Sequence, residues 1–182
     1  MQTPVIALPG GVSPAALRYQ PVAGALPPII DLHLKELEVY AGAEPPPGYS
    51  IEGEVAGLVR FADELGLERF HLLGYSAGGF VSLAFAGCHP GRLLSLAVFE
   101  PAAVPGEPTA EERAQEEVLR RELDGLRGGE FMRAFMQLQV RPGVALEPPA
   151  GPPPDWMRNR PAGLTAVMSA FREYLFDRER FR

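Results

Sequence analysis

One serine, Ser76, lies where the sequence changes abruptly from strand-like to helix-like. The mostly apolar residues 70–75 precede it, and the small and apolar residues 77–86 follow it. Gly74 and Gly78 leave room where a side chain would collide with the neighbouring backbone of a tight turn. A helix that begins directly after the serine points its free N–H groups and the positive end of its dipole toward it. The stretch therefore predicts an exposed, nucleophilic serine, with a structural serine in a glycine turn as the alternative.

Three more apolar runs have the length and composition of strands that are buried on both faces of a parallel sheet. They are residues 4–8, 29–32 and 93–99. A helix is predicted from Ser13 as N-cap, with Pro14 as its first residue, to about Leu26. Another amphipathic helix runs from its cap Ser50 to Gly66. Alternating strands and helices predict an α/β fold, with a parallel sheet of about four strands wrapped by helices.

The last third of the sequence has no strand-like run and becomes helical. A capping box, Thr109-x-x-Glu112, opens a highly charged helix. The pair Gly128-Gly129 ends that helix, and a second helix follows. A proline-rich loop over residues 148–154 leads to a final helix over about residues 162–176. These helices are predicted to form a cap over the serine.

We therefore expect two regions in the chain. They are an α/β core over residues 1–102 and a helical cap over residues 103–182. In the second cap helix, four large apolar side chains share one face: Phe131, Met132, Phe135 and Met136. Phe131 and Phe135 are candidates for the wall of an apolar substrate pocket. The alternative is that these side chains only pack the cap onto the sheet.

Several residues with chemical potential follow predicted strands directly. They are Gly10, Asp31, Ser76 and Glu100. In parallel sheets the carboxyl ends of the strands meet at one edge, and ligands bind beyond that edge. The sequence therefore predicts one site, with Ser76 at its centre and Tyr75 beside it in the substrate pocket.

Composition limits the classes of partner. The net charge of −6 and the pI of about 5.1 argue against nucleic acid and against anionic membrane surfaces. The single cysteine, Cys88, allows no disulfide within the chain, and no segment has the length and apolar character of a membrane span.

No metal or cofactor is expected, because His and carboxylate residues do not cluster at ligand spacing. Gly74 and Gly78 lack the lysine and the third glycine of phosphate-binding loops. We expect a soluble, cytoplasmic protein.

Together these motifs resemble the α/β-hydrolase superfamily, in its cap-bearing branch. The resemblance covers residues 4–102 and rests on Leu-Pro-Gly-Gly, the strand ending in Asp31, Gly-Tyr-Ser-Ala-Gly-Gly and Ala-Val-Phe-Glu-Pro. Pro9 stands where the family usually has histidine, and the family's Asp-x-x-Gly-x-Gly loop is replaced by residues 31–35. The mouth of the site is therefore expected to differ in shape.

The resemblance implies that Ser76 is the catalytic nucleophile. It also implies an oxyanion site made by the backbone N–H of Ala77 and by the turn that contains Gly10 and Gly11. A serine of this kind needs a base, usually an imidazole oriented by a carboxylate. The family order is Ser, then Asp or Glu, then His.

The base and the acid are harder to place. The three histidines are His33, His71 and His89, and none follows Ser76 at the end of a later strand. His33 is the candidate base, because it is predicted to follow a strand whose end faces the same edge as Ser76. Glu100 is the candidate acid, and the alternatives for it are a rim carboxylate or a hinge to the cap.

The resemblance further implies that the usual acid and histidine lie in two later strands, on the order of 80 residues more. Residues 174–182 resemble the family's lead-in to the first of them. An apolar parallel strand over residues 93–99 would then be an open edge. We expect a second copy, in a homodimer, or a cap helix to cover it.

The leading functional prediction is a serine hydrolase of the esterase or acyl-transfer type, acting on a small, apolar, ester-like substrate without a cofactor. The alternative is a non-catalytic relative, a binding module with an open sheet edge. A base beside Ser76 distinguishes the two.

Overall fold

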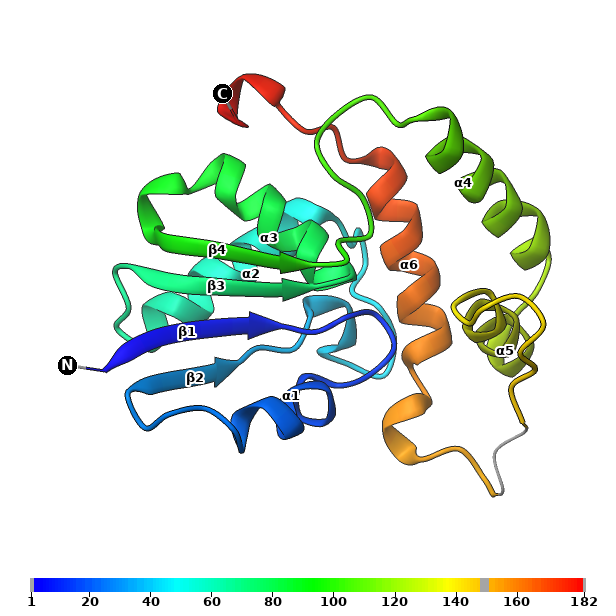
Figure 1. The fold of residues 1–182 in the computed structure, drawn as a ribbon, viewed down its shortest axis with the longest axis horizontal. Coiled ribbons are helices and arrows are strands. Elements are labelled where there is room, and N and C mark those ends of the chain that lie inside the picture. The colour runs from blue at the N-terminus through cyan, green and yellow to red at the C-terminus, as the bar shows by residue number, and fades with distance from the viewer. Residues whose placement is uncertain (1, 148–150, 182) are drawn as a thin grey trace.

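The predicted alternation of strands and helices is confirmed in the structure, a computed structural model that describes residues 2–147 and 151–181 (Figure 1). The strands are β1 (Thr3–Leu8), β2 (Ile30–Leu34), β3 (Phe70–Tyr75) and β4 (Leu93–Phe99). The α-helices are α1 (Ala15–Ala23), α2 (Ile51–Glu64), α3 (Ala77–Cys88), α4 (Ala110–Leu123), α5 (Gly128–Leu138) and α6 (Arg160–Glu173). Short 3₁₀ turns are η1 (Glu38–Tyr40), η2 (Pro90–Arg92), η3 (Asp155–Met157) and η4 (Arg178–Phe181).

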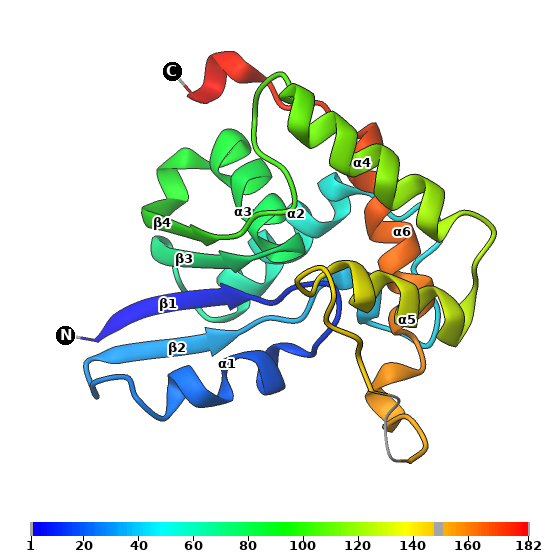
Figure 2. The same ribbon diagram turned by 45° about the vertical axis from the view of Figure 1, so that its right-hand side comes forward.

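The four strands form one parallel sheet in the order β2-β1-β3-β4. Leu8 lies opposite Gly74, and Tyr75 lies opposite Phe99, so the ends of the three neighbouring strands β1, β3 and β4 are level. Helices α4, α5 and α6 lie beyond the arrowheads of the strands, as Figures 1 and 2 show. The fold thus places the helical segment over the edge where the predicted site residues meet.

The main core lies between one face of the sheet and helices α2 and α3. Its largest side chains are buried on all sides: Ile6, Leu8, Leu58, Phe70, Leu72, Phe80 and Phe85. Helix α1 covers part of the opposite face, because Arg18 stacks on Tyr75, whose side chain alternates with those of Phe70 and Leu72 along β3. Strand β3, which leads into the sharp turn at residues 75–78 (the elbow), is therefore central and covered on both faces near its end.

Two element boundaries differ from the sequence predictions. Pro14, not Ser13, is the N-cap of α1, with an extended ψ of 149°, and the helix ends at Ala23. Because Pro14 itself has this extended conformation, the helix begins one residue later than predicted, at Ala15. Strand β2 continues to Leu34, because its backbone pairs with β1 as far as Ala7.

The helical third matches the capping prediction. The Thr109 side chain accepts from the Glu112 N–H at 3.1 Å, and the Glu112 carboxylate accepts from the Thr109 N–H at 2.6 Å. Helix α4 ends earlier than predicted, at Leu123, before Gly125 with a φ of +72°. Of the predicted proline-rich loop, residues 148–150 lie outside the described residues.

Helix α6 belongs to the main core, although it follows the other cap helices in sequence. Val167 and Ala170 are buried in the same cluster as the sheet residues. The ring centroids of Phe171 and Phe80 are 4.3 Å apart, and that of Phe176 is 4.8 Å from Phe80. Helix α5 packs instead in a second cluster, with Phe131, Met132, Leu123 and Leu164 at its centre. The division of the chain at residue 102 into a core and a helical cap stays a prediction. Helix α6, which lies on the cap side of that division in sequence, packs in the main core.

Strand β4 forms an open edge of the sheet. Its side chains are largely exposed, with 45% for Leu94, 38% for Val98 and 57% for Phe99. The expectation that a cap helix covers residues 93–99 is therefore wrong, because the cap helices lie beyond the strand ends rather than beside β4 (Figure 1). Coverage by a second copy stays a prediction. Within the described residues, no helix is both long and apolar enough to cross a membrane.

Candidate active site

Ser76 occupies a strained turn between β3 and α3. Its φ of 50° and ψ of −113° lie in a region that non-glycine residues rarely adopt and that costs free energy to hold. The glycines around it explain how the chain closes so tightly. A Cβ on Gly78 would lie 2.5 Å from the carbonyl oxygen of Pro9, and a Cβ on Gly79 would lie 3.0 Å from the Cα of Pro101. A side chain at position 78 would therefore collide with the backbone, and one at position 79 would require Pro101 to shift by a few tenths of an ångström.

Backbone hydrogen bonds hold the turn from both sides. The Ser76 N–H donates to the carbonyl of Phe99 at 3.1 Å, and the Ala102 N–H donates to the carbonyl of Ser76 at 3.1 Å. The segment after β4 is thereby tied to the serine. Glu100 lies within that segment, is exposed and has a φ of 45°. The predicted acid therefore lies between Phe99 and Ala102, the two residues whose backbones are hydrogen-bonded to Ser76.

The turn after β1 lies against the serine, as the resemblance implied. The carbonyl of Pro9 accepts from the Gly78 N–H at 2.9 Å, and the carbonyl of Gly11 accepts from the Tyr40 hydroxyl. A Cβ on Gly10 would lie 3.3 Å from the Cβ of Ser76. Across the described residues, the backbone N–H groups of Gly10, Gly11 and Ala77 have no hydrogen-bond acceptor. Donors of this kind can stabilise negative charge that develops on a substrate oxygen.

The aromatic rings at the strand ends stack in a row. The ring centroids of Tyr75 and Phe99 are 5.8 Å apart, and the Arg18 guanidinium lies 3.6 Å from the Tyr75 centroid. Tyr19 donates to the carbonyl of Leu8 at 2.6 Å. Burial raises the pKa of Tyr19 to about 12, so its hydroxyl stays protonated and keeps this bond. These contacts fix the end of β1 beside the elbow.

His33 is not where the predicted base was expected. Strand β2 continues past it, and His33 lies opposite Ile6, which lies opposite Leu72. Ser76 is thus four residues along and two strands across from His33, on the order of 16 Å at the spacing of a parallel sheet. The imidazole instead contacts Asp31, with Nε2 and Oδ2 3.0 Å apart. The prediction that His33 follows the end of its strand and is the base for Ser76 is therefore wrong, because His33 lies within β2 and out of reach of Ser76.

The other two histidines are equally remote. His71 lies five residues before Ser76 in β3, and its Nδ1 is 2.7 Å from the Oγ of Ser95. His89 follows the last residue of α3, about 20 Å from the serine by the rise of the helix, and its ring packs on Phe85. None of the three imidazoles therefore lies within hydrogen-bond reach of Ser76.

The predicted pocket residues lie in different surroundings. Tyr75 is half-buried beside Gly10, at the site. Phe131 is buried in the second cluster, and the ring centroid of Phe135 is 6.4 Å from it. Two surface hollows of about 230 and 240 Å³ border α2, one beside Tyr174 and one beside Lys35. Neither includes Phe131 or Phe135, whose contacts are those of packing residues, and their role in a substrate pocket stays a prediction.

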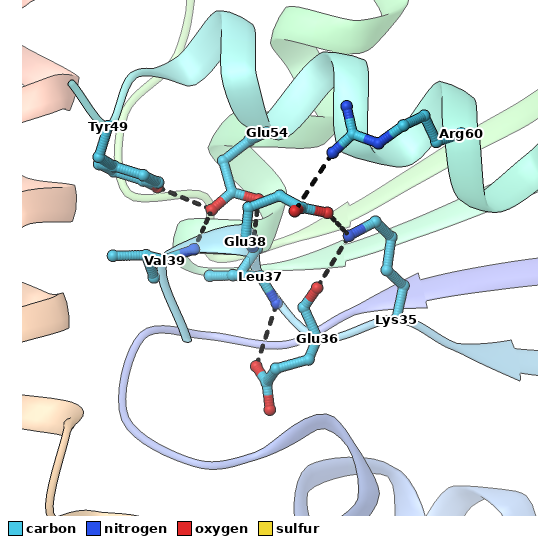
Figure 3. A network of polar contacts seen from close by, with 8 residues as sticks. All are labelled: Lys35, Glu36, Leu37, Glu38, Val39, Tyr49, Glu54 and Arg60. Carbon is cyan, nitrogen blue, oxygen red and sulfur yellow. Dashed lines mark hydrogen bonds and ion pairs between the residues drawn. The ribbon is translucent and has the colours of Figure 1, made fainter. Parts of the chain in front are cut away.

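Sequence reasoning missed a buried polar network behind the site (Figure 3). The Glu54 carboxylate is 2% exposed and accepts from the N–H groups of Glu38 and Val39 and from the Tyr49 hydroxyl. Burial raises the pKa of Glu54, while those three donors oppose the shift. Lys35 is 6% exposed and pairs with Glu38 at 2.7 Å.

A signal for this network was present in the sequence. Glu54 lies three residues after Ile51 and four before Leu58, on the apolar face of α2. Its carboxylate fixes the backbone of η1, which carries Tyr40. Among the residues that the structure describes, no three His, Cys, Asp or Glu side chains gather so that they could hold a metal ion.

A family model described as the alpha/beta hydrolase fold matches residues 42–163. RutD of Caulobacter segnis, named as a candidate carbamate hydrolase, is 33% identical over 97 residues, which are 52% of this chain and 36% of that protein. RutD of Stutzerimonas stutzeri is 37% identical over 65 residues, which are 36% of this chain and 24% of that protein. The matched parts thus span about a third and a quarter of these curated relatives.

Solved structures share the fold over most of this chain. Carboxylesterase CesB (YbfK) from Bacillus subtilis has a TM-score of 0.62 at 21% identity, covering 90% of this chain and 53% of that one. ClbQ from the colibactin NRPS/PKS pathway has a TM-score of 0.61 at 16% identity, covering 97% of this chain and 70% of that one. At such identities the likeness shows the fold alone. Because the family model covers more than half of the sequence, the chain belongs to the α/β-hydrolase family.

Proposed function

We propose that this chain is a serine hydrolase of the esterase or acyl-transfer type, with Ser76 as nucleophile. The observation that carries the proposal is the strained backbone of Ser76 at the N-terminus of the 12-residue helix α3. Strain of this kind persists where the surroundings over-determine it, and it clusters at functional sites. The family assignment is in keeping with this proposal, and one solved structure that shares the fold is named as a carboxylesterase.

The chemistry follows from the donors beside the serine. Ser76 Oγ forms a bond to the carbonyl carbon of the substrate, and one electron pair of the carbonyl moves to its oxygen. The N–H groups of Gly11 and Ala77 bind that oxyanion. The bond to the alcohol then breaks, and the proton that Oγ lost passes through water to the alcohol, since none of the three imidazoles reaches Ser76. Water cleaves the acyl-serine in the same way, so that ester and water give acid and alcohol.

The substrate class is a carbonyl compound with a heteroatom leaving group. An oxyanion site next to a serine acts on esters, and the name of the RutD relatives extends the class to carbamates. The apolar ring of Tyr75 beside Gly10 favours a small apolar acyl or alkyl group. We place simple aliphatic and aryl esters first.

A fluorophosphonate probe tests the proposal on the folded protein. Attack by Oγ forms an oxygen–phosphorus bond and expels fluoride, and intact-mass spectrometry detects the adduct. We expect one adduct on the wild type and none on Ser76→Ala. Ser169→Ala, which changes an exposed serine of α6, is the matched control and should label like the wild type. A wild type that stays unlabelled while folded would refute the proposed activity for this chain.

A second candidate function rests on a specific observation. None of the three imidazoles lies near Ser76, and β4 presents an open edge with four exposed apolar side chains, those of Leu94, Ala97, Val98 and Phe99. A non-catalytic binding module with this fold would show both features. Absence of labelling together with saturable binding of a peptide or a second copy at β4 favours the module.

A further inference from the structure

We propose that Tyr40 is a positioning residue for the turn that supplies the Gly11 N–H, and that Arg160 and Glu36 tie this turn to helix α6. The inference deepens the proposed function and rests on it. It assigns a role to a buried hydroxyl that the sequence patterns did not single out.

Two hydrogen bonds fix the peptide groups on either side of the Gly11 N–H. The peptide between Pro9 and Gly10 is held by the Gly78 N–H, which donates to the Pro9 carbonyl at 2.9 Å. The peptide between Gly11 and Val12 is held by the Tyr40 hydroxyl, which donates to the Gly11 carbonyl. Because each peptide group is planar, fixing both carbonyls restricts the peptide between them, whose N–H belongs to Gly11. That N–H has no acceptor among the described residues.

The Tyr40 hydroxyl is a donor with no alternative state at ordinary pH. Tyr40 is 7% exposed, and burial raises its pKa well above the usual value. Arg160 lowers that pKa to a smaller extent, and Glu36 raises it further. A buried hydroxyl needs an acceptor, and the Gly11 carbonyl is the one it contacts.

Helix α6 holds the ring of Tyr40 in place. The Arg160 guanidinium lies 3.8 Å from the ring centroid, a cation–π contact. A Cβ on Gly163 would lie 2.8 Å from Cδ1 of Tyr40, so the ring packs directly on the helix backbone. The side chain of Leu164, one residue on, lies over Gly11 itself. Three residues of α6 therefore contact either the Tyr40 ring or the turn itself.

Glu36 contacts both Arg160 and the far end of the turn. Its Oε2 lies 3.1 Å from Nη2 of Arg160 and accepts from the Ala15 N–H at 3.2 Å. Arg160 is 4% exposed, so the ion pair is well shielded from solvent on its side. The turn from Gly11 to Ala15 is thus held at both ends by groups that Arg160 contacts. This is a link between the cap side of the molecule and the candidate oxyanion site.

The test compares Tyr40→Phe with Tyr174→Phe in the full chain. Both variants delete one hydroxyl from a buried or half-buried tyrosine, and the Tyr174 hydroxyl contacts the sulfur of Cys88 at the end of α3, away from the turn. With ¹⁵N-glycine label, NMR relaxation gives the backbone order parameter of Gly11, with the buried helical Gly57 as reference. We expect the Gly11 value to fall from about 0.85 to below about 0.6 in Tyr40→Phe alone. Equal values in the two variants would overturn the proposal.

Two further measurements separate this inference from the proposed activity. The rate of fluorophosphonate labelling is expected to fall about tenfold in Tyr40→Phe and to stay unchanged in Tyr174→Phe, because a displaced oxyanion donor weakens transition-state binding. If the wild type does not label, the activity is refuted and the relaxation result still decides the role of Tyr40. If Tyr40→Phe does not fold, a nuclear Overhauser contact from a slowly exchanging Tyr40 hydroxyl proton to Gly11 in the wild type supports the proposal, and its absence refutes it.

Discussion

Replacing Gly78 by alanine tests the close approach of β1 to the elbow. The new Cβ would lie 2.5 Å from the Pro9 carbonyl oxygen and 2.7 Å from both the Cβ and the carbonyl oxygen of Leu8. Two of these atoms are backbone atoms at the end of a central strand, and they cannot move aside without disturbing the sheet. Overpacking of this kind costs about 3 kcal/mol at the upper end of its usual range.

A second effect acts in the opposite direction. Gly78 lies in helix α3, where alanine is favoured over glycine by about 1 kcal/mol. The net expectation is that Gly78→Ala lowers the free energy of unfolding by about 2 kcal/mol. For a chain of this size that corresponds to a fall in Tm of roughly 4–8 °C.

Gly129→Ala is the matched control for this substitution. Gly129 lies in helix α5, and a Cβ there would meet no atom within 4 Å. Only the helix preference remains, so Tm should rise by roughly 1–4 °C or stay unchanged. Thermal unfolding followed by circular dichroism measures both variants. If Gly78→Ala is as stable as Gly129→Ala, the close packing of β1 against the elbow is refuted.

Two other predictions concern the backbone of Ser76 and the open edge. Ser76→Gly should be more stable than Ser76→Ala, because glycine relieves the strained φ and ψ. The reference is the same pair of substitutions at Ser50, an N-cap with ordinary extended angles, and the difference at Ser76 should exceed that at Ser50 by about 1–3 kcal/mol in urea unfolding. Equal differences at the two serines would contradict the strain. We further expect two copies to pair through β4, so that light scattering finds a dimer for the wild type and a monomer for Val98→Lys. The control Val104→Lys changes a valine outside the strand that is 52% exposed, against 38% for Val98, and should leave the dimer intact. A monomeric wild type, or a dimeric Val98→Lys, would count against this pairing.

The sequence predicted the parts of the site that depend on short-range pattern. Ser76, Gly74 and Gly78 fall at a junction of strand and helix, and such a junction has few ways to close. The cap of α2 at Ser50 and the capping box at Thr109 were predictable for the same reason, since each depends on residues three apart. The order of strands and helices gave the fold class.

The positions of the histidines show where short-range pattern fails. His33 was expected beyond a strand end, and pairing with β1 extended β2 past it. A strand end is fixed by the neighbouring strand as well as by the residues of the strand itself, so the sequence of β2 alone could not place His33. The partners of Glu54 could not be predicted from short-range pattern either, because Glu38 and Val39 lie 16 and 15 residues away in the chain.

The sequence by itself determined the elbow, the alternation of elements and the membership of one fold class, because each follows from hydrophobic periodicity and from the steric freedom of glycine over a few residues. The tertiary structure alone decided that no imidazole meets Ser76, that α6 packs in the main core, and that the Tyr40 hydroxyl reaches the Gly11 carbonyl across 29 positions of sequence. Contacts of that kind depend on how the strands align and how the helices pack against them. No local pattern contains that information, because burial and pairing are properties of the whole assembled chain.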